Sequence, residues 1–258
     1  MNTAARPTTD QSAHWYTKTG EPCYSVPLAN GTGMRSTTLA DARKLDLLPS
    51  VTTILRVLHK PALETWKQEQ LGLALMTTPR IAGETDDQFV FRVIHTERQH
   101  EQERDAAAKR GTDLHQGIQD HFQGRFVDPE VWPWIEPMLN ILSRYGKFVS
   151  CETVLVAPGF AGRTDLIMTG PEGIWIWDFK STRKVPSESW PEHKLQLSAY
   201  AKAYGDPFET INTGNIYIST VNQGEFSVCE HAESWQEIYL RGFKPLLQYW
   251  QWANDYRP

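Results

Sequence analysis

The chain has 258 residues, a formal net charge of −5, 40% hydrophobic residues and 22% charged residues. This size and apolar content predict a globular fold with a substantial core. The negative balance argues against a strongly basic protein that coats nucleic acid by long-range attraction, although it leaves room for a local basic groove. The three cysteines, Cys23, Cys151 and Cys229, are too few and too scattered for a disulfide framework or a zinc knuckle.

The N-terminal sequence MNTAARPTTDQSAHW contains no apolar signal core, and no apolar run in the chain reaches membrane-spanning length. We therefore expect a soluble, cytoplasmic protein that does not act at a membrane. Residues 1–12 are polar and are predicted to form a flexible N-terminus.

Residues 13–100 are predicted to be mainly helical. In the segment LPSVTTILRVLHKPALETWK, Ser50 or Thr52 is placed to cap one helix, and Pro61 is typical of the first turn of a second. The stretch TTPRIAGETDD has the composition of a connection. Good helix formers dominate residues 87–123, and DPEVWPWIEPMLNILSRYGKFV then predicts a further helix.

After this helix the apolar pattern alternates with a period of two, which is typical of strands. The strand candidates are CETVLVAP, RTDLIMT, GIWIWDFKS, NIYISTV and FSVCEH. A helix, SWPEHKLQLSAYAKAYG, separates the third from the fourth, with Ser189 and Glu192 fitting a capping box and Gly205 fitting its end. The segment SWQEIYLRGFKPLLQYWQWAND predicts a final amphipathic helix with a break near Pro245. These elements predict an α/β (α+β) fold in which helices flank a central mixed sheet.

The second and third strand candidates form a hairpin that carries two acids and a base. If the turn TGPEG is centred on its PE pair, Ile167 faces Ile176 and Asp165 faces Asp178. Directly opposed side chains have Cβ atoms about 5 Å apart, a distance at which two carboxylates repel each other. Since side chains alternate along a strand, Lys180 points to the same face as Asp178. The three charged groups therefore converge at one end of one face.

Three interpretations of this convergence are open. The charges could be solvated at an exposed strand end, or they could form a buried ion network. They could also form a divalent cation site beside a lysine that handles protons. A metal ion between the carboxylates would remove their repulsion, and oxygen ligands suit Mg²⁺ or Mn²⁺.

Four further residues could reach this end of the sheet. Glu152 starts the preceding strand, and His115 lies on the inward side of the long helical region, at helical spacing from Ile118. Gln196 and Tyr200 are four apart and share one face of the helix between strands. Taken singly, each is as well explained by a solvated glutamate, a hydrogen-bonded core histidine or an ordinary amphipathic helix.

Together, these segments resemble the PD-(D/E)XK nuclease superfamily, and specifically its RecB-like branch. The matching pieces are GTDLH (111–115), Glu152, GRTD (162–165), DFK (178–180) and QLSAY (196–200). The segment LPSVTTILRVLHKPALETWK is similar to one that precedes the core in mitochondrial genome maintenance exonucleases and phage-type exonucleases. The resemblance implies a restriction-endonuclease-like catalytic core over residues 101–258, within a single nuclease domain of residues 13–258.

The resemblance also implies a metal site. His115, Asp165 and Asp178 would bind a catalytic Mg²⁺ or Mn²⁺, with the carbonyl of Phe179 as a further ligand. Glu152 would support that ion or a second one. Relatives with an iron–sulfur cluster need four cysteines, and with three in the chain we expect no such cluster.

The remaining catalytic roles follow from the same resemblance. Lys180 would position or activate the attacking water and stabilise charge on the phosphate, and Gln196 and Tyr200 would hold the lysine and the substrate backbone. Metal ions suit this reaction because they neutralise the phosphodiester and lower the pKa of a bound water. Candidates for contacts with DNA flank these motifs: Arg110, Arg163, Arg183, Lys184, Lys194 and Trp190.

We therefore expect a metal-dependent deoxyribonuclease, specifically an exonuclease that acts on single-stranded DNA or DNA ends. It would work in a bacterial or phage-infected cell, with recombination or replication proteins as candidate partners. The alternatives are a structure-selective endonuclease of the same superfamily and a nuclease-fold DNA-binding subunit that has lost cleavage. The presence of Asp165, Asp178 and Lys180 together favours an active enzyme.

Overall fold

The computed structural model describes residues 13–58, 61–97, 101–205 and 210–258. Its centre is a sheet of five strands in the order β5-β6-β7-β8-β9. Neighbouring strands run antiparallel except β7 and β8, which run parallel and are joined by the crossover helix α7. The strands are β5 (Lys147–Ala157), β6 (Phe160–Gly170), β7 (Gly173–Thr182), β8 (Ile211–Ser219) and β9 (Phe226–Glu230). The expected mixed sheet with flanking helices is thus confirmed.

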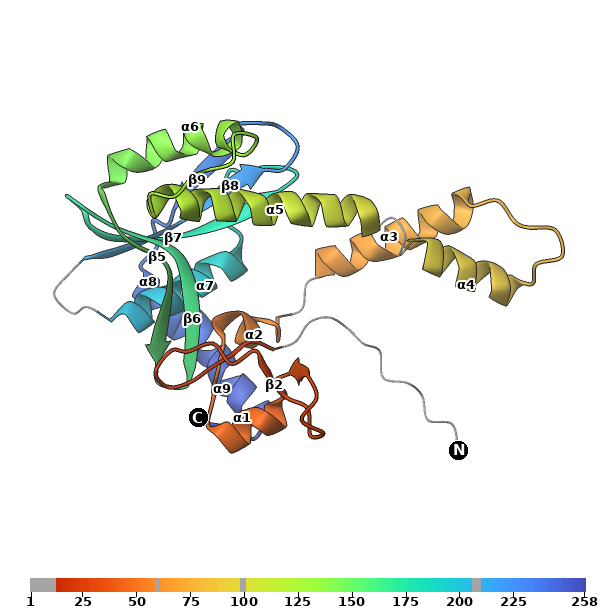
Figure 1. Ribbon diagram of the computed structural model, residues 1–258, viewed down its shortest axis with the longest axis horizontal. Coiled ribbons are helices and arrows are strands. Elements are labelled where there is room, and N and C mark those ends of the chain that lie inside the picture. The colour runs from red at the N-terminus through yellow and green to blue at the C-terminus, as the bar shows by residue number, and fades with distance from the viewer. Residues whose placement is uncertain (1–12, 59–60, 98–100, 206–209) are drawn as a thin grey trace.

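Helices cover both faces of this sheet (Figure 1). Helices α5 (Glu101–Phe122) and α6 (Trp132–Leu142) pack on one face, and α6 continues into a short 3₁₀ turn, η1 (Ser143–Tyr145). Helix α7 (Pro191–Tyr204) packs on the other face, beside α2 (Val51–Leu55) and the C-terminal helices. The C-terminal helices are α8 (Trp235–Ile238), the π-helical turn η2 (Tyr239–Phe243) and α9 (Lys244–Ala253), so the break falls next to Pro245 as predicted.

Side-chain alternation along β7 builds two separate cores. Trp175, Trp177 and Phe179 point into the core under α5 and α6, whereas Ile174 and Ile176 point into the core under α7. Trp177 is fully buried and stacks on Trp175 with ring centroids 4.9 Å apart. This apolar filling on both faces leaves Asp178 and Lys180 at the end of the strand as the exceptions that need partners.

The hairpin has the register expected from its turn. Ile167 pairs with Ile176, and the ladder continues to Leu166 and Trp177. Asp165 and Asp178 are the next residues along each strand, one position beyond the last paired residues. Beyond the ladder the Asp165 carboxylate accepts a hydrogen bond from the backbone N–H of Phe179, with 2.7 Å between Oδ2 and N.

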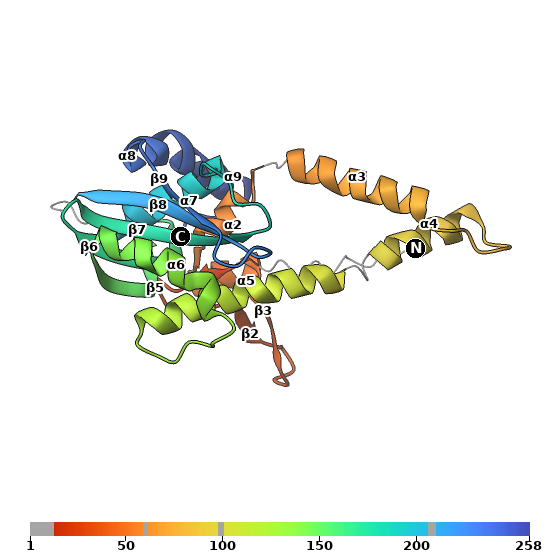
Figure 2. The same cartoon turned by 90° about the horizontal axis from the view of Figure 1, so that it is seen from above.

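The N-terminal part holds short strands as well as the expected helices. Its elements are β1 (Trp15–Tyr16), β2 (Ser25–Pro27), β3 (Met34–Ser36), α1 (Leu39–Leu45), β4 (Leu48–Pro49), α2, α3 (Pro61–Thr77) and α4 (Asp86–Glu97). Helices α3 and α4 pair through Ala74, Phe89 and Val93 and project away from the sheet (Figures 1 and 2). The single long helical region expected over 87–123 is therefore two helices, α4 and α5, with residues 98–100 outside the described part.

Helix ends agree with the sequence signals at three positions and disagree at one. Ser50 caps α2 by accepting a hydrogen bond from the N–H of Thr53, Pro61 opens α3, and Gly205 ends α7 in the left-handed conformation. The capping box of Ser189 and Glu192 is wrong. Trp190 is the N-cap of α7 because the proline that follows it takes the first helical position. The Ser189 hydroxyl is instead hydrogen-bonded to a histidine ring, as described below.

Candidate functional site

A cavity of about 610 Å³ opens where the ends of β6 and β7 meet α5, α7 and the N-terminal segment. Its walls include every residue that the sequence analysis placed at the metal and lysine site. They are His115, Glu152, Asp165, Asp178, Phe179, Lys180, Gln196 and Tyr200. These side chains come from two strands of one hairpin, the neighbouring strand and two helices, so the folded sheet brings together residues that are up to 85 positions apart in the sequence.

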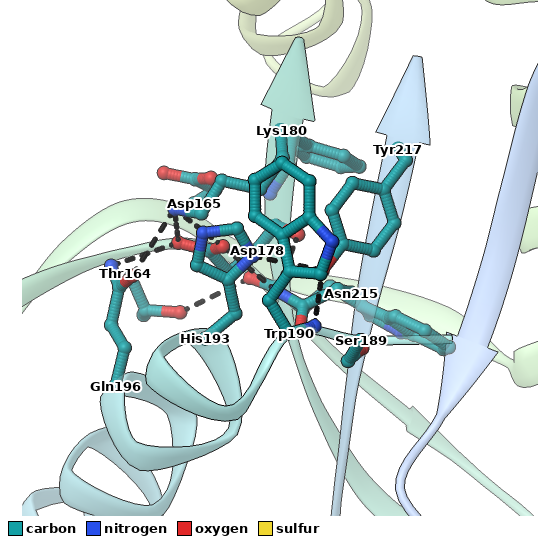
Figure 3. Close-up of polar contacts among 12 residues, drawn as sticks. Thr164, Asp165, Asp178, Lys180, Ser189, Trp190, His193, Gln196, Asn215 and Tyr217 are labelled. Atoms are coloured by element: carbon teal, nitrogen blue, oxygen red, sulfur yellow. Dashed lines mark hydrogen bonds and ion pairs between the residues drawn. The ribbon is translucent and has the colours of Figure 1, made fainter. Parts of the chain in front are cut away.

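Asp178 and Lys180 form the centre of a buried polar network (Figure 3). The ammonium group of Lys180 lies 2.9 Å from Oδ1 and 2.7 Å from Oδ2 of Asp178, and 3.1 Å from Oε1 of Gln196. Gln196 donates its amide hydrogens to Oδ1 of Asp178 (3.0 Å) and to the Tyr200 hydroxyl (2.9 Å). The spacing of four residues on α7 therefore fixes the glutamine, which in turn orients both charged groups.

Burial and neighbouring charges shift the pKa values of the ionisable groups in this network. Burial, followed by the nearby Asp178 carboxylate, raises the pKa of Asp165 well above its ordinary value. Burial by itself would lower the pKa of Lys180, but Asp178 and Asp165 outweigh it and raise that pKa instead. Two carboxylates thus share one ammonium group, and the site favours additional positive charge.

His115 reaches the same place from the opposite face of the sheet. Its Nδ1 lies 4.0 Å from Oδ2 of Asp165, and its ring meets the ring of Phe179 edge-on. Helix α5 can approach β7 this closely because Gly111 has no side chain; a Cβ there would lie 2.4 Å from Oγ of Ser181. Burial lowers the pKa of His115, so the imidazole is neutral at pH 7 and keeps a lone pair available to a cation.

Glu152 lies on β5, the strand next to β6 and its Asp165. Its neighbours Cys151 and Thr153 pair with Leu166 and Thr164, which places Glu152 opposite Asp165. Its backbone has φ of 52°, a left-handed conformation that costs a non-glycine residue about 1–2 kcal/mol. Burial raises the pKa of its carboxyl, and Arg163 lies 2.8 Å from Oε2 as a counter-charge. A strained, half-buried acid beside the two aspartates suits a functional role better than a structural one.

The glycine of the GRTD segment has a packing role at this site. A Cβ at Gly162 would lie 2.5 Å from Cε1 of Tyr200 and 3.1 Å from a methyl group of Val51. Only the absence of a side chain lets the Tyr200 ring lie over β6 and hold Gln196.

The basic and aromatic residues expected to contact DNA are spread over several surfaces. Arg163 lines the cavity and pairs with Glu152. Trp190 is 46% exposed and lies beside the rings of His193 and Tyr217 (Figure 3). Of the six, only Arg163 lines the cavity. Arg110 donates to the carbonyl of Thr220 and lies over Trp134, Lys194 pairs with Glu233, and Arg183 and Lys184 are exposed after β7.

Sequence reasoning missed Asn215 and His231. Asn215 is fully buried on β8, and its amide donates to Oδ2 of Asp178 at 2.9 Å. Its own oxygen lies 3.0 Å from Nε2 of His231, which is also 3.0 Å from the hydroxyl of Ser189. A lone asparagine in the strand NIYIS gives no signal, but the parallel register of β7 and β8 sets Asn215 directly beside Asp178.

We expect Asn215→Leu to lower DNA cleavage about 10- to 100-fold, the usual cost of removing a group that orients a metal ligand. Leucine has a similar volume but cannot donate to Asp178, so the carboxylate loses a fixed partner. The measurement is the cleavage rate as a function of Mg²⁺ or Mn²⁺ concentration, where we expect the half-saturating concentration to rise. A rate and metal dependence equal to those of the unaltered protein would contradict this role.

The candidate metal ligands at this site are of the chemical types that a hard divalent cation prefers. Carboxylates of Asp165, Asp178 and Glu152 are the ligands that Mg²⁺ and Mn²⁺ prefer, and a neutral His115 suits Mn²⁺. The ammonium of Lys180 already sits as a cation against both oxygens of Asp178. Their arrangement does not yet form a complete metal site, because within the described residues no three His, Cys, Asp or Glu side chains lie close enough together to hold a metal ion.

Comparison with known proteins finds one family model that matches part of this core. Residues 138–238 match the family model of the PD-(D/E)XK nuclease superfamily. The chain has the PD-(D/E)XK fold. The match supports the superfamily and indicates a nuclease. Within the matched segment lie the hairpin acids, Lys180 and the face of α7 that carries Gln196 and Tyr200.

Other comparisons add little to the PD-(D/E)XK assignment. One solved structure, entitled "Crystal structure of SSO0001", is 16% identical over 59% of this chain and 69% of that chain, with a TM-score of 0.29. At this score the likeness carries no argument. No curated protein matches the chain. Of the helices that the structure describes, none is both long and apolar enough to cross a bilayer.

Proposed function

We propose that this protein is a metal-dependent DNA exonuclease that acts on single-stranded DNA or on DNA ends. The observation that supports it most is the single network in which Asp178, Lys180 and Gln196 are joined beside Asp165 and His115, in one cavity. A structural ion network would not need a cavity of this size. The RecB-like resemblance of the sequence favours an exonuclease.

The metal would be held by the acidic end of the cavity. Asp165, Asp178 and His115 would be its ligands, with the Phe179 carbonyl completing the set and Glu152 supporting the same or a second ion. A bound Mg²⁺ or Mn²⁺ supplies charge neutralisation of the phosphate and lowers the pKa of a coordinated water. The N–H of Phe179 already holds Oδ2 of Asp165, so that carboxylate keeps one orientation while its other oxygen is left for a cation.

Lys180 would act on the phosphate and the water. Its raised pKa keeps it positively charged at neutral pH, so it can stabilise negative charge that develops on the phosphate oxygens. Gln196 holds the ammonium in place from α7, and the Tyr200 hydroxyl holds Gln196. Arg163, at the cavity wall, and Trp190, exposed beside α7, would contact the DNA strand.

The test is cleavage of end-labelled linear DNA and of covalently closed circles, each with Mg²⁺, Mn²⁺ or EDTA. We expect cleavage of linear single strands with either metal, none with EDTA, and no cutting of circles. Cutting of circles would show an endonuclease instead. Retention of DNA without cleavage under every metal condition would show a binding subunit and overturn the proposal.

A further inference from the structure

The cavity has a second wall that does not belong to the acidic network. It is formed by His14, Tyr16, Tyr24, Ser50 and Thr52, all from the N-terminal segment and all outside the residues that match the superfamily. This wall is attached to the sheet beside the catalytic hairpin, because Ser50 forms a β-bridge with Ala161 at the start of β6. Nothing in the proposed reaction uses these side chains.

Three aromatic rings of this wall contact one another in series. His14 and Tyr24 stack with centroids 4.6 Å apart and planes 27° apart, and Tyr24 meets Tyr16 edge-on at 5.6 Å. The Tyr24 hydroxyl donates to that of Tyr16 at 2.6 Å. Tyr16 is buried and anchors the group, Tyr24 is half-buried, and His14 is exposed. A supported stack whose outer member faces solvent is the kind of platform on which nucleobases stack.

Positive charge reaches the same wall. Partial desolvation of the exposed His14 ring, then the guanidinium groups of Arg56 and Arg163, lower the pKa of His14, so its ring is neutral at pH 7. Arg163 lies at the border between the two walls, paired with Glu152. Neutral rings beside guanidinium groups provide stacking for a base and attraction for the phosphate that follows it.

We propose that the His14–Tyr24 stack binds an unpaired nucleotide next to the scissile phosphate. The ligand class is a DNA strand with at least one unpaired base, since a base inside a duplex has both faces covered by its neighbours. The hydroxyl of Thr52, an exposed residue in the first turn of α2, lines the same recess and suits the polar edge of that nucleotide. This inference rests on the proposed nuclease function and assigns part of its substrate preference to the N-terminal segment.

The test uses single-stranded oligonucleotides that carry 2-aminopurine, a base whose fluorescence is quenched when it stacks. Binding is measured with Ca²⁺ in place of the catalytic metal, and the KM for cleavage is measured separately with Mg²⁺. We expect His14→Ala and Tyr24→Leu each to lose the quenching and to raise KM about 10- to 100-fold, the equivalent of one stacked base. Tyr24→Phe keeps the ring and should keep the quenching.

Controls separate this inference from the proposed function. Tyr249→Leu removes a tyrosine that is 53% exposed on α9 and does not line the cavity, so quenching and KM should be unchanged. The stability control is that His14→Ala and Tyr24→Leu unfold at the same urea concentration as the unaltered protein. If the unaltered protein cleaves DNA and these two variants keep its quenching and its KM, the proposed stacking site is wrong. If no DNA is cleaved at all, the proposed function fails, and the quenching still reports on the stacking site.

Discussion

Replacing Lys180 by methionine is expected to lower DNA cleavage by about two orders of magnitude or more, because the variant loses the ammonium group that we propose stabilises charge on the phosphate. The same change leaves the Asp178 carboxylate, which is 2% exposed, without its cation. We therefore also expect a loss of about 1–3 kcal/mol in the free energy of unfolding, less than for a fully buried pair because 26% of the lysine side chain is exposed.

A double-mutant cycle with Asp178→Asn separates the two effects. Each single variant leaves one member of the Asp178–Lys180 ion pair without its partner, whereas the combination of Asp178→Asn and Lys180→Met removes both charges of that pair. The double variant should be more stable than either single one in urea unfolding, while all three should fail to cleave end-labelled DNA. Cleavage by Lys180→Met at more than about a tenth of the normal rate would contradict the mechanism, whatever the stability data show.

Replacing Trp177 by alanine is expected to cost about 3–5 kcal/mol in the free energy of unfolding, the usual range for a large aromatic residue deleted from a core. Trp177 is 0% exposed, stacks on Trp175, and fills the space over Gly214, where a Cβ would lie 2.3 Å from the ring. The loss should appear as a lower urea midpoint measured by circular dichroism.

The matched control is Trp252→Ala on α9, which removes the same side chain at a position that is 71% exposed. Its unfolding free energy should stay within about 0.5 kcal/mol of the unaltered value. Equal midpoints for the two tryptophan variants would mean that Trp177 does not carry the packing between β7 and the layer of α5 and α6.

Much of this fold could be predicted from local patterns. Period-two alternation located the five strands, and the turn TGPEG set the hairpin register that pairs Ile167 with Ile176 and leads to Asp165 and Asp178 at the end of the ladder. The failures are also local. The capping box of Ser189 and Glu192 was a plausible pattern, but the proline at position 191 and the contact between Ser189 and His231 decided otherwise.

For the site, the sequence by itself determined which acids and which lysine share one end of one sheet face, because hairpin register and side-chain parity depend only on neighbouring residues. It could not determine what surrounds them. The parallel pairing of β7 with β8 brings Asn215 to Asp178, and the bridge from Ser50 to β6 brings His14 and Tyr24 to the cavity. These contacts join segments that are 37 or more residues apart, so only the closure of the sheet and the packing of the N-terminal segment against it decide them.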